Sequence, residues 1–249
     1  MLLLIVGFML LVGGAAVLLA AATLKFQGRA VWGFGAICAG GLGALMIIVP
    51  TAVDISDTQT GIISKTIGSD LPQNHVVAFN GEKGPQAEIL GPGWHFGYWP
   101  WKYEITKVET IVIPAGSLGV VNALDGKPLP PDNVYAPPWK DQDSMLDAAV
   151  FLKGEGYRGP QLTVLTPGRY RFNPHLFTIE PRPALNVNAG EVVVVKANSG
   201  QTYTGEAQQV NGTSLVPRGF RGIWSTPLEP GAYYLHPDAY HTVPVVTTN

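Results

Sequence analysis

The sequence predicts a membrane-anchored, mainly β protein in which an N-terminal transmembrane helical hairpin precedes a tandem of small β-rich modules with one short inserted helix. Three observations support this. The chain opens with two uncharged apolar runs. Short alternating β-branched runs that end in glycine follow them. A leucine strand, a Pro-Gly pair and an aromatic strand then occur in that order three times, which indicates an internal repeat.

The first 53 residues predict two transmembrane helices. The run from Leu2 to Leu24 is long enough, at about 1.5 Å per residue, to cross a hydrocarbon core of about 30 Å. A second run, 30–53, follows the polar turn KFQGR and is rich in glycine, so we expect close helix packing. The alternative is a signal peptide cleaved after the alanines at 20–22, but no basic residue precedes the first run.

Two basic residues in the hairpin turn, Lys25 and Arg29, predict the orientation. Positive charges favour the cytoplasmic side of a membrane. They therefore place the turn in the cytoplasm and everything after Val53 on the extracytoplasmic side of an integral membrane protein.

Three runs rich in β-branched residues predict strands. These runs are HVVAFNG (75–81), SLGVVNALDG (117–126) and GEVVVVKANSG (190–200). The elements that follow them are AEILGPGWHF, LTVLTPGRYRF and STPLEPGAYYL. Proline at the second and glycine at the third position predict a type II turn in each. The predicted turn residues are Pro92, Gly93, Pro167, Gly168, Pro230 and Gly231.

The spacing of these elements divides the chain after the hairpin. The first β module, with an aromatic turn, covers 54–126, the second covers 159–200, and a loop and the start of a third module cover 201–249. Residues 127–158 form a Pro-rich insertion with a short helix. That helix begins at Asp141 or Asp143 and ends at Gly154.

Composition excludes several classes of protein. Charged residues make up 14% of the chain, against about a quarter in soluble domains, which suits a surface in contact with neighbours or a membrane. A net charge of −2 argues against nucleic acid as a partner. The single cysteine, Cys38, excludes a disulfide framework within the chain.

The aromatic turn of the first module is the strongest candidate site. Its members are Trp94, Phe96, Tyr98, Trp99, Trp101 and Tyr103. Trp and Tyr favour the headgroup depth of a bilayer, and the matching turns further along the chain lack tryptophan, so we predict a membrane-interface site. The alternative is that these rings fill the sheet core or a subunit seam.

No catalytic, cofactor or metal site is predicted. The chain carries neither a nucleophile motif of the G-x-S-x-G type nor a phosphate-binding loop. His236 and His241 stand five apart in an extended segment, where a structural role is the favoured interpretation.

The ordered set of motifs resembles the opening of the SPFH domain, the Band 7 superfamily of stomatin, prohibitin and flotillin. The residues that carry the resemblance are GEKGPQAEILGPGWHFGYWP and RGIWSTPLEPGAYYLHPDAYHTVPVVTTN. The chain is most similar to bacterial flotillin-like members, over about residues 71–249. It departs from them because the motif occurs three times rather than once, and because the family continues into a long helical coiled coil.

The resemblance implies a non-enzymatic scaffold in a bacterial inner or plasma membrane. Such a protein forms a large homo-oligomeric ring or cage that organises membrane microdomains or encloses a partner membrane protein or protease. The alternative is a membrane-anchored extracytoplasmic binding module that uses the WHFGYWPW platform for glycans or peptides.

Overall fold

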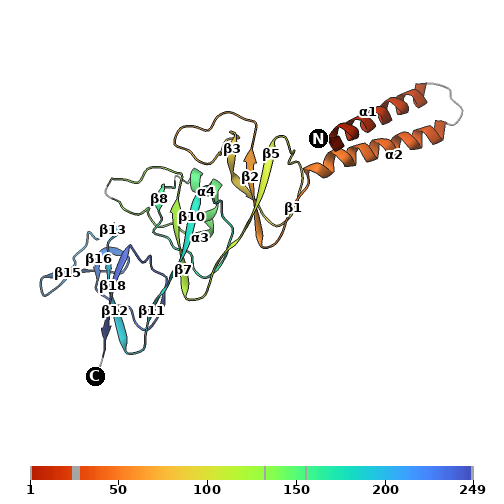
Figure 1. The fold of residues 1–249 in the computed structure, drawn as a ribbon. Helices are drawn as coiled ribbons and strands as arrows, with labels where there is room; N and C mark the ends of the chain where they lie inside the picture. The colour runs from red at the N-terminus through yellow and green to blue at the C-terminus, as the bar shows by residue number, and fades with distance from the viewer. Residues whose placement is uncertain (1, 24–28, 132, 155, 248–249) are drawn as a thin grey trace.

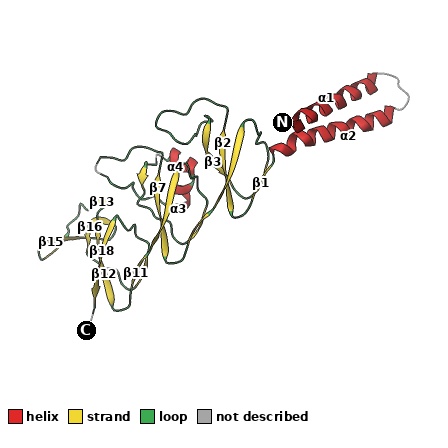
Figure 2. Ribbon diagram, viewed as in Figure 1, coloured by secondary structure: helices red, strands yellow, loops and turns green. Residues whose placement is uncertain are grey.

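The computed structural model describes residues 2–23, 29–131, 133–154 and 156–247. Two apolar N-terminal helices form a contacting hairpin, and a mostly β region of several small antiparallel sheets follows them (Figures 1 and 2). This confirms the predicted order of elements. Helix α1 spans Leu2–Thr23 and α2 spans Arg29–Ile48, which continues into a 3₁₀ turn at Val49–Thr51. Both helices are long and apolar enough to cross a membrane.

Glycine packing joins the two helices. A Cβ atom on Gly7 would lie 2.8 Å from the carbonyl oxygen of Gly43, and one on Gly14 would lie 2.8 Å from that of Ala36. By contrast, a Cβ on Gly33 would meet nothing within 4 Å. Part of the predicted glycine interface is therefore confirmed. Lys25, on which the orientation depends, lies outside the described residues.

The β region consists of three units that share an arrangement of five strands, to which unit 3 adds β13, β14 and β15. Unit 1 (53–109) contains β1 Val53–Ile55, β2 Gln59–Lys65, β3 Gly84–Leu90, β4 Gly93–His95 and β5 Tyr103–Glu109. Unit 2 (111–183) contains β6 Ile111–Ile113, β7 Ser117–Ala123, β8 Gly159–Pro160, β9 Gly168–Tyr170 and β10 Phe177–Pro183. Unit 3 (185–246) contains β11 Leu185–Val187, β12 Glu191–Ala197, β13 Gln201–Thr202, β14 Gln208–Val210, β15 Thr213–Val216, β16 Phe220–Trp224, β17 Gly231–Tyr233 and β18 Tyr240–Val246.

Strand pairing is equivalent in the three units. Each unit has a long central strand with a partner on either side. In unit 1, β2 pairs with β3 and β5; in unit 2, β7 pairs with β8 and β10; in unit 3, β12 pairs with β16 and β18. The short strands pair separately, as β1 with β4, β6 with β9 and β11 with β17. The register also matches, because the last residue of each central strand, Lys65, Ala123 or Ala197, faces the first residue of its unit's last strand. Residues can therefore be compared position by position across the units.

The prediction of a strand at 75–81 is wrong. This segment is a loop that meets β3 through a single bridge between Ala78 and Gln86, and the central strand of unit 1 is β2. The cause lies in unit 2, where the buried carboxylate of Asp125 accepts hydrogen bonds from the backbone N–H groups of Val76 and Val77, at 2.7 and 3.2 Å. Those amides are not free for a sheet ladder.

Pairing groups the strands differently from the division made on the sequence. Residues 117–126 and 190–200 closed the first and second modules in that division. In the structure β7 pairs with β10 and β12 pairs with β18, so each run belongs to the unit that follows it. Unit 3 therefore has the same complete set of strands as units 1 and 2.

The insertion of unit 2 forms two short helices rather than one, α3 (Gln142–Leu146) and α4 (Ala148–Lys153). Asp141 caps α3 by accepting a hydrogen bond from the Ser144 amide. Asp147 ends α3 and caps α4 through the amides of Ala149 and Val150. A second capping aspartate so close behind the first splits the predicted helix. Gly154 is the C-cap of α4, as predicted.

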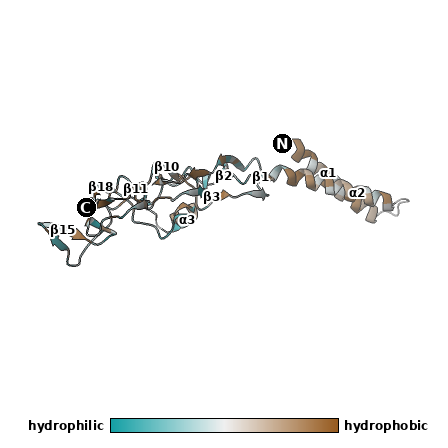
Figure 3. Cartoon of the chain, turned by 90° about the horizontal axis from the view of Figure 1, so that it is seen from below, coloured by the Kyte–Doolittle hydropathy of each residue, from teal (hydrophilic) through white to brown (hydrophobic). Residues whose placement is uncertain are grey.

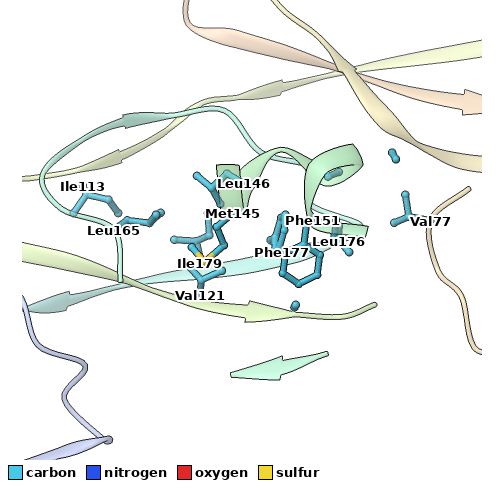
Figure 4. Packing of buried hydrophobic residues seen from close by; sticks show 13 residues of the cluster. Val77, Ile113, Val121, Met145, Leu146, Phe151, Leu165, Leu176, Phe177 and Ile179 are labelled. Carbon is cyan, nitrogen blue, oxygen red and sulfur yellow. The ribbon is translucent and has the colours of Figure 1, made fainter. Parts of the chain in front are cut away.

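Each unit has its own apolar cluster, but the clusters differ in membership. That of unit 2 is built around Phe151 and Phe177 and also contains Val77 and Ala87 of unit 1 (Figure 4). That of unit 3 draws its members from 185–240. The core of unit 1 is small, with Ile55, Ile63 and Leu90 at its centre.

The units follow one another in a row that leads away from the helical hairpin (Figure 1). The helices are mostly apolar along their length, whereas the β units are mixed (Figure 3). One residue joins neighbouring units, Thr110 between β5 and β6 and Ala184 between β10 and β11. Each donates its N–H to a carbonyl of the preceding unit. Thr110 donates to Thr58 at 2.8 Å, and Ala184 donates to Gly116 at 2.9 Å.

Candidate membrane-proximal aromatic surface

Thr51 connects the end of the second helix to the aromatic turn. Its hydroxyl donates to the carbonyl of Ile48 at 2.7 Å and accepts from the amide of Gly97 at 3.2 Å. Its own carbonyl accepts from the amide of Tyr98 at 3.2 Å. Thr51 is buried, so these bonds are shielded from water. The aromatic turn is thus fixed directly at the end of α2.

Most of the rings predicted to meet the membrane point outward. Trp94 lies opposite Asp54 in the β1–β4 pair, and it and Phe96 are 66% and 62% exposed with nearly parallel rings. Trp101 is 54% exposed, and its ring centroid lies 4.8 Å from that of the half-buried Trp99. These four residues, Trp94, Phe96, Trp99 and Trp101, are called the aromatic surface below.

Tyr98 and Tyr103 have a different role from the other four. Their rings meet edge to face at 5.5 Å and pack on the Ile55 and Ile63 cluster of unit 1. Burial, followed by the nearby Glu88 carboxylate, raises the pKa of Tyr98. The membrane-interface prediction and its core alternative therefore each describe part of the set.

The Pro-Gly pairs lie at equivalent corners. Each proline, Pro92, Pro167 or Pro230, is a bend residue, and each glycine, Gly93, Gly168 or Gly231, is the first residue of the short fourth strand. The φ angle is +108° at Gly93 and +155° at Gly231, but Gly168 has no positive φ. A type II turn has a φ of about +80° at this residue, so the predicted turn type is wrong for the second and third pairs, and only Gly93 comes near it.

A side chain two residues after each glycine fixes these corners. His95 Nε2 lies 2.8 Å from the Gly91 carbonyl oxygen. The hydroxyls of Tyr170 and Tyr233 donate to the carbonyls of Thr166 and Glu229, each at 2.9 Å. The motif P-G-x-[HY] marks these residues in the sequence, and the structure adds that their polar ring atoms bond to the backbone.

A second recurring corner, called the entry turn, starts the last strand of each unit. The three entry turns are Trp99–Tyr103, Asn173–Phe177 and His236–Tyr240, each with proline second. In all three, the amides of the last two residues donate to the carbonyl of the first, at 2.9 to 3.2 Å. They are therefore the same structure in three copies.

The entry turns differ in what their first residue meets. Buried Asn173 donates from Nδ2 to the carbonyl of Gln86 in unit 1, at 2.7 Å. His236 packs on Tyr135 of unit 2, with 4.8 Å between ring centroids. In unit 1 the equivalent residue is Trp99, and the chain that precedes this unit is helix α2. Trp99 thus occupies the position at which the later units contact a preceding unit.

An open groove of about 800 Å³ lies between the sheet of unit 1 and helices α3 and α4. Its lining combines rings with ionisable groups. Among them are Phe79, Tyr98, Tyr103, Lys65, Glu88, Asp143, Asp147, Arg169 and Arg171.

The histidines do not come together. His236 is buried at the junction with unit 2, while His241 is exposed on β18. Within the described parts of the chain, no group of three or more His, Cys, Asp or Glu residues is placed to hold a metal ion.

Comparison with protein-family models, with curated proteins and with solved structures finds no match for this chain.

Proposed function

We propose that the chain is a non-enzymatic membrane scaffold whose copies assemble into a large ring or cage. The observation that carries the proposal is the row of three equivalent β units held, through Thr51, at the end of an apolar helical hairpin. Stacked repeats form extended surfaces suited to binding partners. Organisation of membrane microdomains, or enclosure of a partner membrane protein or protease, is the role that the resemblance to bacterial flotillin-like proteins supplies.

The aromatic surface supports the membrane part of this proposal. Rings with one polar edge, here those of Trp94, Trp99 and Trp101, are stabilised at headgroup depth, and the turn that carries them is bonded to Thr51 at the end of α2. In the proposal the hairpin crosses a bacterial inner or plasma membrane, and the β units stand on its extracytoplasmic side. The basic residues Lys25 and Arg29 are the reason for that choice of side.

Self-assembly by pairing of strand edges is disfavoured by proline. The last strand of each unit lies at the edge of its sheet. Val193 exchanges both backbone hydrogen bonds with Leu228, so its partner on β18, Pro244, has its nitrogen toward the free edge. In unit 2, Gly119 exchanges both backbone hydrogen bonds with Leu165, so its partner on β10, Pro181, also has its nitrogen toward the free edge. Proline at these positions cannot donate to another strand.

A side-chain face of unit 3 is the better candidate for contact between copies. Val243 and Val245 are 47% and 44% exposed and lie opposite Val194 and Val192, on the face away from the unit 3 core. In unit 2 the positions of Val243 and Val245 are Glu180 and Arg182. This valine face is the self-association surface in the proposal, because exposed apolar patches mark interfaces.

The mass of the detergent-extracted protein, by size exclusion with light scattering and negative-stain imaging, tests the proposal. A large closed particle is expected, and Val243→Glu with Val245→Glu should reduce it to small species. The matched control is Thr106→Glu, at the exposed position of unit 1 that corresponds to Val243, and it should leave the mass unchanged. A monomeric unsubstituted chain would contradict assembly itself, whereas equal masses for all variants would contradict only the valine face.

The groove favours a second candidate, an extracytoplasmic module that binds glycans or peptides. Aromatic rings beside carboxylates and guanidinium groups suit such ligands. Binding by a monomeric chain in titration with glycan and peptide panels, lost in Tyr103→Ala and kept in Trp94→Ala, would support this candidate over the scaffold.

A further inference from the structure

The junction between units 2 and 3 contains a buried histidine. His236 begins the entry turn of unit 3 and is 2% exposed. Its ring meets that of Tyr135, from the insertion of unit 2, edge to face at an angle of 64°. The two rings come from different units, so the state of one affects how the units are joined.

Hydrogen bonding at His236 selects its neutral form. Nδ1 lies 3.3 Å from the amide nitrogen of Asp238 and accepts that hydrogen, which leaves the ring proton on Nε2. Nε2 has no hydrogen-bond partner among the described residues. A second proton on Nδ1 would face the Asp238 N–H directly, and the charge that it brings would lie in a buried site.

The surrounding groups reinforce this preference. Burial is the largest effect and lowers the pKa of His236 below its ordinary value of 6.5. The Asp238 carboxylate and a hydrogen bond to the backbone of His236 itself raise the pKa in part, and the Arg182 guanidinium of β10 lowers it. The third neighbour, Tyr135, stays neutral, because burial raises its pKa.

We propose that protonation of His236 breaks the contact between units 2 and 3, so that unit 3 pivots about Ala184 in acid while units 1 and 2 remain joined. Acid removes the acceptor at Nδ1 and places a charge on a ring that is 2% exposed, which costs desolvation free energy in the closed state. The entry turn of unit 3 then moves toward water, where the imidazolium is solvated.

The equivalent residue in unit 2, Asn173, gives the first junction no acceptor that acid can remove at this turn. The histidine at the first junction is His75, whose Nδ1 lies 3.0 Å from the Asp125 carboxylate, and a proton on that ring strengthens the contact. Asn173 Oδ1 accepts from the amide of His175 at 3.0 Å, as His236 Nδ1 accepts from Asp238. Its Nδ2 in addition donates to the Gln86 carbonyl at 2.7 Å. An amide keeps both bonds at any pH between 5 and 8, because only a side chain such as histidine titrates there. His236→Asn is therefore the matched variant, since this turn already folds with asparagine.

The test measures distances between spin labels by pulsed electron paramagnetic resonance on the full chain in lipid nanodiscs, at pH of about 7.5 and about 5. A Cys38→Ser background carries cysteines at the exposed positions Asp143 and Ser214 for the second junction. Glu104 and Asp143 serve for the first junction.

In the labelled chain that keeps His236, the distance distribution across the second junction should broaden reversibly in acid, while the distribution across the first junction stays narrow. His236→Asn should stay narrow at both pH values. Equal widths at both pH values in the background chain would overturn the proposal without recourse to any variant. Broadening that persists in a folded His236→Asn chain would overturn the role of the imidazole.

Discussion

The two junctions of the β region are built on the same turn and held by different chemistry. Between units 1 and 2, Val77 and Ala87 enter the core of the next unit, and Asp125 and Asn173 add hydrogen bonds to backbone groups. Between units 2 and 3, the core of unit 3 remains separate and an aromatic pair makes the contact. Units that share the same strand pairing can thus be joined by contacts of different strength, because the side chains at equivalent positions decide the strength of each contact.

Loss of the Asp125 carboxylate should weaken the first junction most. Asp125→Ala leaves the buried amides of Val76 and Val77 without an acceptor, so we expect a loss of about 3 kcal/mol in the free energy of unfolding. Denaturant titration of the full chain measures this. The exposed Asp143→Ala is the control and should change little. A loss no larger than that of the control would contradict the role of Asp125.

Removal of Asn173 should have a smaller effect on the same junction. Asn173→Ala loses the bond to the Gln86 carbonyl and the acceptor for the His175 amide, at a cost of about 1.5 kcal/mol. The same titration applies. Asn173→His provides the sharper comparison, because it should give the first junction the acid response of the second. A first junction that stays unresponsive with histidine would show that the surroundings of His236 are needed as well.

Acid should destabilise unit 3 selectively. Because the folded pKa of His236 lies below 6.5, the open state binds the proton more readily. The stabilisation from neutral His236 is present above pH 6.5 and is lost as pH falls through and below that value. Amide hydrogen exchange, corrected for the intrinsic pH dependence, should show lost protection at 133–136 and 236–240 and not at 75–79. Equal losses at both junctions would point to general acid unfolding.

The smallest effect is expected at the membrane end. Trp99→Ser with Trp101→Ser removes two rings of the aromatic surface without reaching the core of unit 1. Quenching of tryptophan fluorescence by brominated lipids should then decrease relative to the unsubstituted chain, because rings at headgroup depth are lost. Trp139→Phe, in the apolar cluster of unit 2, is the control and should leave the quenching unchanged. Unchanged quenching in the double variant would contradict membrane contact.

Local patterns in the sequence were sufficient to predict the hairpin, the three repeats and the Gly154 cap. Apolar length, glycine turns and capping residues act within a few positions of the chain, so their effect is readable there. Residues 75–81 have the local pattern of a strand but form a loop, because the amides of Val76 and Val77 are bound by Asp125, far along the chain. No local pattern carries that contact.

The candidate site was predicted only in part for the same reason. The aromatic composition of residues 94–103 indicated a site, but which rings point outward depends on packing against Ile55 and Ile63. The contacts that Asn173 and His236 make with the preceding unit were also not predicted. Each appears as a single polar residue before proline until the units are aligned by their register.

The single-residue connection at Ala184 sets how far unit 3 can travel once its contact is broken. A tether of one residue spans no more than about 3.6 Å, and the prolines at 181 and 183 stiffen the strand that leads into it. Unit 3 can therefore tilt but cannot drift away, so Tyr135 and His236 keep a high effective concentration for each other. The junction should close again as soon as the proton leaves, and its opening should remain fully reversible over repeated cycles of acid and base.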